Sequence, residues 1–223
     1  MSFVDQIAPP LVAGEKLSRD EFLRRWELLP ELKKAELIGG VVYMPSPVSL
    51  GHRSHHGAVL YLLFHYAVFT PGCDAGADGT WLMLEDAPQP DVDLRILPAY
   101  GGQSRVAGKY ASGAPELVAE ISRSSKSYDL GPKLNLYRKA GVREYIAVLL
   151  KESKVIWRRM TGDVESFIEP DRDGILRSLV FPGLWLDPDA LLKPDLPRML
   201  RVLDRGLHSP EHDQFVKDLA RRV

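Results

Sequence analysis

A β-favourable and mostly apolar stretch covers residues 116–122, with the sequence Glu-Leu-Val-Ala-Glu-Ile-Ser. This composition is typical of a strand in a sheet that is covered on both faces. An amphipathic helix is predicted next, from Asp129 to Ala140, and Gly141 ends it. An apolar strand from Glu144 to Leu150 follows. A strand, a helix and a strand in this order predict a right-handed parallel crossover and therefore an α/β domain.

The sequence on either side of this unit predicts further elements. Upstream we expect helices over about 18–28 and 51–69, a tight β-hairpin over 36–44, strands over 80–84 and 91–97, a turn-rich stretch over 71–79, and a Gly- and Ser-rich loop over 98–115. Downstream, short alternating runs between 153 and 181 predict an antiparallel extension of the sheet. We assign residues 1–192 to one domain and residues 193–223 to a charged, helical C-terminal tail.

The composition is that of an ordinary globular protein. The chain has 223 residues, enough for one sizeable core, and contains 45% hydrophobic and 26% charged residues. Its formal net charge is −1, unlike that of a protein that coats nucleic acid non-specifically. Binding of nucleic acid would therefore depend on a local basic surface or on bound metal ions.

Two further features bear on where the protein works. Cys73 is the single cysteine, which excludes an intrachain disulfide and fits a reducing cytoplasm. The most apolar stretch, from Ala58 to Phe69, has 12 residues and contains His65. Because that stretch is too short to span a bilayer, we expect a cytoplasmic protein with no membrane partner.

Two acidic residues are candidates for chemistry. Asp91 begins the strand over 91–97, and Glu120 lies inside an otherwise apolar strand. A carboxylate buried without a partner is unfavourable, so Glu120 requires a cation or hydrogen bonds. A Mg²⁺ or Mn²⁺ ion shared with Asp91 would satisfy both groups, because these ions prefer oxygen ligands. A salt bridge from Glu120 to a nearby arginine is the structural alternative, and Asp93, on the same strand face as Asp91, is the rival ligand.

An ordered set of motifs resembles the Uma-type family of putative restriction endonucleases, over roughly residues 17–192. The motifs are Glu36-Leu37-Ile38-Gly39-Gly40-Val41-Val42-Tyr43-Met44 with Ser46-Pro47 and His52, then Gln89-Pro90-Asp91-Val92, Pro115-Glu116-Leu117-Val118-Ala119-Glu120-Ile121-Ser122, Asp129-Leu130-Gly131-Pro132-Lys133-Leu134-Asn135-Leu136-Tyr137, Ala140-Gly141-Val142-Arg143-Glu144-Tyr145 and Pro182-Gly183-Leu184.

The resemblance implies a restriction-endonuclease-like fold of the PD-(D/E)xK group, with a mixed central β-sheet flanked by helices. It also implies a metal site made by Asp91, Glu120 and the upstream Glu36. The Ile121 carbonyl is a candidate for one more metal ligand.

The sequence departs from the group pattern at Ser122, which stands where the group has a lysine, two residues after Glu120. Lys133 is the candidate replacement, because its long side chain can reach the site from the next helix, and Uma-type proteins are similar in this placement. Two structural alternatives remain open here. Lys133 can form a surface ion pair with Asp129, four residues before it, and Asp129 can cap the helix.

The histidines of the 51–69 helix do not match a zinc motif. Arg53 follows His52 where the His-Glu-x-x-His motif has its glutamate, and the sequence has no cysteine cluster. His52 matches the family's histidine. It is a candidate for contacting a substrate phosphate, or for capping the helix.

A phosphate backbone could also be bound just after the strand that carries Glu120. Ser122, Arg123 and Lys126 are the candidates there. Arg138 and Lys139 are more simply explained as a solvated helix face.

These expectations combine into an Mg²⁺-dependent endonuclease that acts on DNA, with Asp91, Glu120, Lys133 and Glu36 as its catalytic residues. The metal would activate a water molecule, and Lys133 would orient it, deprotonate it or stabilise the charge that develops. The alternative is a catalytically inactive nuclease-fold protein that binds nucleic acid or regulates another protein. A third hypothesis is a structural partner protein, a homodimer formed through residues 187–223.

Overall fold

A six-stranded mixed sheet forms the centre of the computed structural model, which describes residues 9–44, 49–122, 126–162 and 164–223. The strand order is β11-β10-β9-β8-β5-β3. The strands are β3 (Cys73–Ala77), β5 (Val92–Ile96), β8 (Leu117–Ser122), β9 (Glu144–Leu149), β10 (Lys154–Thr161) and β11 (Val164–Phe167). The predicted parallel crossover is confirmed, because β8 and β9 pair in parallel from Leu117–Glu144 to Ser122–Leu149. The other neighbours in this sheet pair antiparallel.

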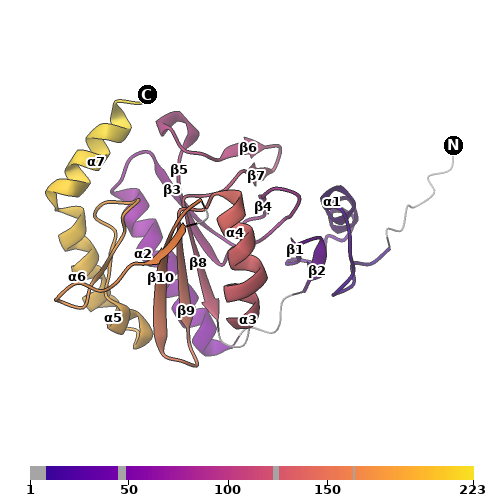
Figure 1. The fold of residues 1–223 in the computed structure, drawn as a ribbon, viewed down its shortest axis with the longest axis horizontal. Coiled ribbons are helices and arrows are strands. Elements are labelled where there is room, and N and C mark those ends of the chain that lie inside the picture. Colours follow the sequence, from indigo (N-terminus) through magenta and orange to yellow (C-terminus); the bar gives the residue numbers. More distant parts are fainter. Residues whose placement is uncertain (1–8, 45–48, 123–125, 163) are drawn as a thin grey trace.

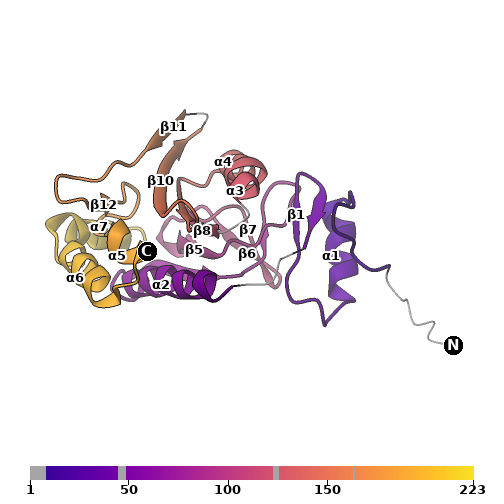
Figure 2. The same cartoon turned by 90° about the horizontal axis from the view of Figure 1, so that it is seen from below.

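Helices cover both faces of the sheet (Figures 1 and 2). Helix α2 (Leu50–Val68) lies on one face with the C-terminal helices α5 (Pro188–Leu192), α6 (Leu196–Leu207) and α7 (Pro210–Ala220). The opposite face carries α3 (Lys126–Tyr128), a π-helical turn (Asp129–Lys133) and α4 (Leu134–Ala140). Because β8 alternates between the faces, Ala119 and Ile121 belong to the core under α2, while Val118 belongs to the core under α4. Glu120 therefore faces α4.

A smaller unit beside the sheet contains α1 (Arg19–Glu27) and the hairpin of β1 (Glu36–Ile38) and β2 (Val41–Tyr43). The Ser18 side chain caps α1 as predicted. Gly39 and Gly40 both have positive φ, which explains why the sequence places two glycines at this turn. Leu37 forms a bridge with Ala87 and so fixes the hairpin against the segment that leads into β5.

Several predicted elements were wrong in detail. The stretch over 71–79 was expected to be a turn, but residues 73–77 form edge strand β3, which pairs with β5 although it lacks β-branched residues. The expected loop over 98–115 contains a 3₁₀ turn (Pro98–Tyr100), β6 (Arg105–Ala107) and β7 (Tyr110–Ser112), and β7 pairs with β4 (Trp81–Leu82). Of the predicted antiparallel extension, β10 and β11 join the central sheet, whereas β12 (Leu176–Arg177) pairs with β13 (Trp185–Leu186).

The C-terminal helices share the main core. Met199, Leu203, Leu207 and Leu219 are buried in the cluster that also contains α2 side chains. The boundary at residue 192 stays a prediction, and side chains from both sides of it pack together. Within the residues described, we find no helix with the length and apolar character needed to cross a membrane.

We predict that Gly206→Ala destabilises the protein. A Cβ at this helical position would stand 2.1 Å from the carbonyl oxygen of Gly183, so backbone would have to move, at a loss of about 1–3 kcal/mol or more. Gly57→Ala in α2 is the matched control, because no heavy atom lies within 4 Å of its added Cβ. Urea unfolding should show Gly57→Ala equal to or more stable than wild type. Equal stability of Gly206→Ala and wild type would contradict the packing of α6 on this core.

Candidate active site

The structure brings Asp91 and Glu120 to the same place on the sheet. The register pairs Val92 with Ala119, which places Asp91, one residue earlier, beside Glu120. The backbone N–H of Ile121 donates to Oδ2 of Asp91 at 2.9 Å. Both side chains are buried, at 8% and 2% exposure. The two acids identified from the sequence therefore form one site.

Glu36 reaches this site from the hairpin. Its Oε1 accepts a hydrogen bond from the backbone N–H of Gln89 at 2.7 Å. Because Gln89 lies two residues before Asp91, this bond fixes the first acid relative to the second.

Lys133 joins Glu36 to Glu120. Its Nζ lies 3.0 Å from Oε1 of Glu36 and 2.7 Å from Oε1 of Glu120. The alternative of a surface ion pair with Asp129 does not hold, because Lys133 is 3% exposed and Asp129 is also buried. The alternative of an arginine partner for Glu120 does not hold either, because Lys133 supplies the cation.

A π-helical turn positions Lys133. Residues 129–133 form this wide turn, which contains Pro132 and continues into α4. Proline lacks an N–H and clashes with the preceding turn of an α-helix, and the wider π turn accommodates it. The alternative in which Asp129 caps the helix does not hold, because Asp129 directly follows α3 and opens the π-helical turn inside a continuous helical segment.

Two tyrosines surround the lysine. The Tyr137 hydroxyl donates to Oε1 of Glu120 at 2.7 Å, which gives this core residue a place in the site that its helical spacing alone did not indicate. The Nζ of Lys133 lies 5.7 Å from the ring centre of Tyr128 and 5.9 Å from that of Tyr137. Among the described residues, the buried Tyr128 hydroxyl has no hydrogen-bond partner.

The pKa values of Glu120 and Asp91 shift in opposite directions. Burial raises the pKa of Glu120 well above its usual value, and Asp91 acts in the same direction while Lys133 opposes it. Burial also acts to raise the pKa of Asp91, but His52, Lys133 and Lys34 outweigh it and hold that pKa well below its usual value. Glu120 therefore holds a proton more readily than Asp91 does.

Lys133 stays charged. Burial disfavours its ammonium, but Glu120, Glu36, Asp91 and Asp129 raise its pKa well above the usual value. A protonated lysine in this position is a hydrogen-bond donor and a positive charge.

A cation that no sequence motif indicated lies at the outer side of Asp91. The Nζ of Lys34 lies 2.6 Å from Oδ1 of Asp78 and 3.4 Å from Oδ1 of Asp91. Lys34 precedes the hairpin and Asp78 lies in a turn, and neither position carries a recognisable motif. Only the fold brings them together.

Two histidines of α2 also reach Asp91. His52 Nε2 lies 3.7 Å from Oδ2 of Asp91, which raises the pKa of His52. The Ser49 hydroxyl accepts from the backbone N–H of His52, so Ser49 rather than the histidine side chain caps α2. His56 Nε2 lies 2.9 Å from the backbone oxygen of Asp91. Ligand atoms of His56, Asp78 and Asp91 lie within 4.8 Å of one another.

The remaining predicted site residues have different outcomes. Ser122 is buried at the end of β8. Arg123 and the side chain of Lys126 lie outside the described residues. Asp93, the rival ligand, accepts a hydrogen bond from Trp81 Nε1 at 3.3 Å and lies beside Gly76 of β3. The backbone of Ile121 helps to raise the pKa of His52.

Comparisons with known proteins agree with this architecture. Residues 19–189 match the model of the Uma2 family, described as a putative restriction endonuclease. A putative nuclease of the DUF820 group from Anabaena variabilis ATCC 29413, solved as a crystal structure, is similar in fold, with a TM-score of 0.57. The similarity covers 79% of this chain and 99% of that one, at 17% sequence identity. No curated protein matches the chain.

We predict that Asp93 makes stability depend on pH. Burial raises the pKa of Asp93 to about 6, above its value of about 3.9 in an unfolded chain, so the folded state binds the proton more tightly. The free energy of unfolding should therefore fall as the pH rises from about 4 to about 6, by about 2–3 kcal/mol. Asp93→Asn should remove this dependence. Urea unfolding across that range would contradict the assignment if both proteins lost stability equally.

We also predict that Lys133→Met destabilises the fold by about 3–5 kcal/mol, because it leaves Glu36 and Glu120 buried without their cation. Adding Glu120→Gln to Lys133→Met should recover a large part of the loss, since the unpaired charge is removed. Chemical unfolding of the wild type, both single variants and the double variant measures the coupling. Additive effects of the two substitutions would show that the pair does not interact.

Proposed function

This chain belongs to the Uma2 family of putative restriction endonucleases, and from that premise we propose that it hydrolyses phosphodiester bonds in DNA with the help of Mg²⁺ or Mn²⁺. The observation that carries the proposal is Lys133 Nζ at 3.0 Å and 2.7 Å from Glu36 and Glu120. Three acids and one lysine from separate segments meet in one buried place. Burying such a cluster lowers the stability of the fold. Its presence therefore favours a role for these residues in chemistry.

The donor set fits a hard divalent cation. Asp91, Glu120 and Glu36 supply carboxylate oxygens and Ile121 supplies a carbonyl, which are the ligand types that Mg²⁺ and Mn²⁺ prefer. The buried Tyr128 hydroxyl, without a hydrogen-bond partner among the described residues, is a polar group that could contact a metal-bound water. A bound Mg²⁺ ion lowers the pKa of its water ligand and neutralises charge on the scissile phosphate.

The protein side chains have distinct roles in this proposal. Asp91, held ionised by His52, Lys34 and Lys133, is a ready anionic ligand. Lys133 holds the carboxylates of Glu36 and Glu120 in position. Because these acids raise the pKa of its ammonium group, Lys133 is suited to donate hydrogen bonds to the developing negative charge.

Lys34 is a positioning residue. It bridges Asp78 and Asp91 and so orients the Asp91 carboxylate from the solvent side. His52 lies on the same side, at 21% side-chain exposure, where it can contact a substrate phosphate.

We predict that Glu120→Gln lowers metal-dependent cleavage by at least about 100-fold. Removal of a residue that hydrogen-bonds to a metal ligand typically lowers metal affinity or activity by about 10- to 100-fold. Removal of a ligand itself should have a larger effect. The assay follows plasmid and single-stranded DNA in Mg²⁺ or Mn²⁺, with EDTA as the blank. Calorimetric titration of Mn²⁺ gives an independent readout, in which Glu120→Gln should bind the ion more weakly.

Asp93→Asn is the matched control, because Asp93 lies on the same face of β5 as Asp91 but is bound to Trp81. This variant should cleave DNA and bind Mn²⁺ as the wild type does. Undiminished cleavage by Glu120→Gln would refute the proposed role of Glu120. A wild-type protein that binds DNA without cleaving it would instead be the inactive nucleic-acid-binding protein.

A further inference from the structure

A second polar feature lies at the other end of α4 from Lys133. It is a cavity of about 620 Å³ between the C-terminus of α4, the β10–β11 hairpin and the end of α7. Its basic lining residues are Arg138, Lys139, Arg143, Arg159 and Arg222. Among the described residues that line it, none is an aspartate or a glutamate. We call this feature the basic pocket.

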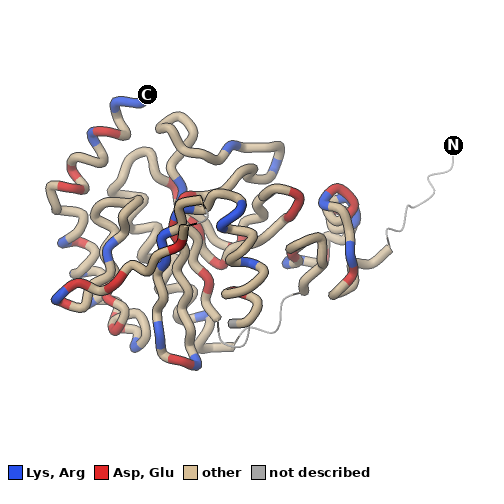
Figure 3. Tube along the Cα trace, in the orientation of Figure 1, with Lys and Arg blue, Asp and Glu red and all other residues tan. Residues whose placement is uncertain are grey.

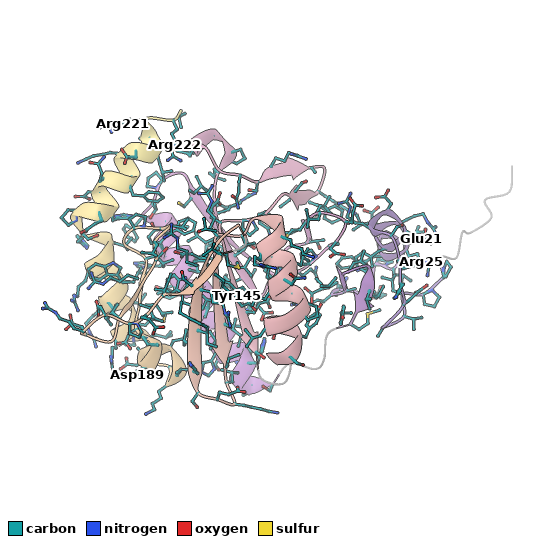
Figure 4. The ribbon with its side chains drawn as sticks, viewed as in Figure 1. Glu21, Arg25, Tyr145, Asp189, Arg221 and Arg222 are labelled. Atoms are coloured by element: carbon teal, nitrogen blue, oxygen red, sulfur yellow. The ribbon has the colours of Figure 1, made fainter. Side chains whose placement is uncertain are left out.

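Segments far apart in the sequence build the basic pocket. Arg222 lies just after the C-terminal end of α7, where Figure 4 labels it, and Arg159 comes from β10. In Figure 3, Lys and Arg positions mark α4, β10 and the C-terminal end of the chain. A solvated helix face would explain Arg138 and Lys139 alone. It does not explain why β10 and the segment after α7 add cations to the same cavity.

Two of the cations in the pocket have neutral partners. Arg143 Nε donates to the side-chain oxygen of Gln103 at 3.2 Å, and an Arg222 nitrogen donates to the backbone oxygen of Tyr100 at 3.2 Å. These bonds orient two guanidinium groups without cancelling their charge.

Glu144 of β9 lies opposite Arg159 of β10 in the strand register. It is fully buried, and its carboxylate accepts from Trp157, Ser178 and the backbone of residues 179 and 180. The pocket is therefore a concentrated positive region on a chain whose net charge is −1.

Its position suits a polymer of phosphates. Lys133 and Lys139 are six positions apart, which corresponds to about 9 Å along a helix, so the pocket is distinct from the acidic cluster yet close to it. Arginine is the preferred side chain for binding phosphate, because its planar group donates two parallel hydrogen bonds.

We propose that the basic pocket binds the phosphodiester backbone of the nucleic acid whose scissile phosphate lies at the acidic cluster. This inference rests on the proposed function. It assigns to Arg143, Arg159 and Arg222 the contacts that fix the strand away from the reacting bond.

The test compares two double variants. Arg159→Gln with Arg222→Gln removes one cation from β10 and one from the segment that follows α7, both inside the pocket. Lys154→Gln with Lys217→Gln removes one exposed cation from β10 and one from α7, both outside the pocket. Both change the net charge equally, so a general electrostatic effect would appear in both.

Binding of a labelled DNA duplex and of a labelled single strand is measured by fluorescence anisotropy in EDTA over a range of salt concentrations. For the pocket variant, the slope of log K against log salt should fall by about 1.8 for duplex, at about 0.9 for each lost phosphate contact. The control variant should keep the wild-type slope. Equal slopes for all three proteins, equal losses in both variants, or no binding by the wild type would overturn the inference.

Two further arms separate the possible failures. Titration of the wild type with pyrophosphate tests for a small ligand. Pocket-dependent pyrophosphate binding without an effect on DNA would overturn the backbone assignment. Cleavage is then assayed separately in Mg²⁺. Absence of cleavage with the slope difference intact would contradict the nuclease proposal alone, while cleavage without a slope difference would contradict only the pocket.

Discussion

The ammonium group of Lys133 between Glu36 and Glu120 is the interaction on which the site depends. A buried carboxylate without a cation is strongly unfavourable, and here one cation lies within 3.0 Å of two carboxylates from different segments. The hairpin, the central strand and the π-helical turn must all be in place for that contact to form. Other features support it, since the Gln89 N–H fixes Glu36 and the Tyr137 hydroxyl fixes Glu120.

The same arrangement gives the two sheet carboxylates different properties. Asp91 lies toward solvent, where Lys34 and His52 approach it and keep its pKa low. Glu120 lies deeper, where burial raises its pKa and Lys133 offsets part of that effect. Carboxyl groups in one site whose surroundings separate their pKa values are a common basis for acid, base and ligand roles. Here the separation follows from depth, because Asp91 stands just before β5 at the edge of the site and Glu120 lies within β8.

The sequence predicted the parts of this structure that depend on local pattern. The strand–helix–strand unit follows from apolar runs, and Glu120 stands out because it interrupts one. The position of Lys133 depends on a π-helical turn that periodicity does not reveal. Strand β3 has weak β-propensity and exists because β5 offers it a partner. Lys34, Asp78 and Gln89 belong to the site through contacts between distant segments, for which no spacing rule gives a signal. Family resemblance supplied Glu36 and favoured Lys133, while the residues alone supplied Asp91 and Glu120.

Helix α4 and the turn before it connect two regions of opposite character. Their first part carries Lys133 into a cluster of acids, and their last part carries Arg138 and Lys139 to a cavity without described acidic residues. Although the net charge of the chain is only −1, positive and negative groups are therefore separated along α4 and the turn before it. A negatively charged substrate is repelled by the acidic cluster until a cation is bound there, so attraction must come from elsewhere on the surface. The basic pocket meets that requirement, because Arg143 and Arg222 are held there by neutral oxygens and keep their charge.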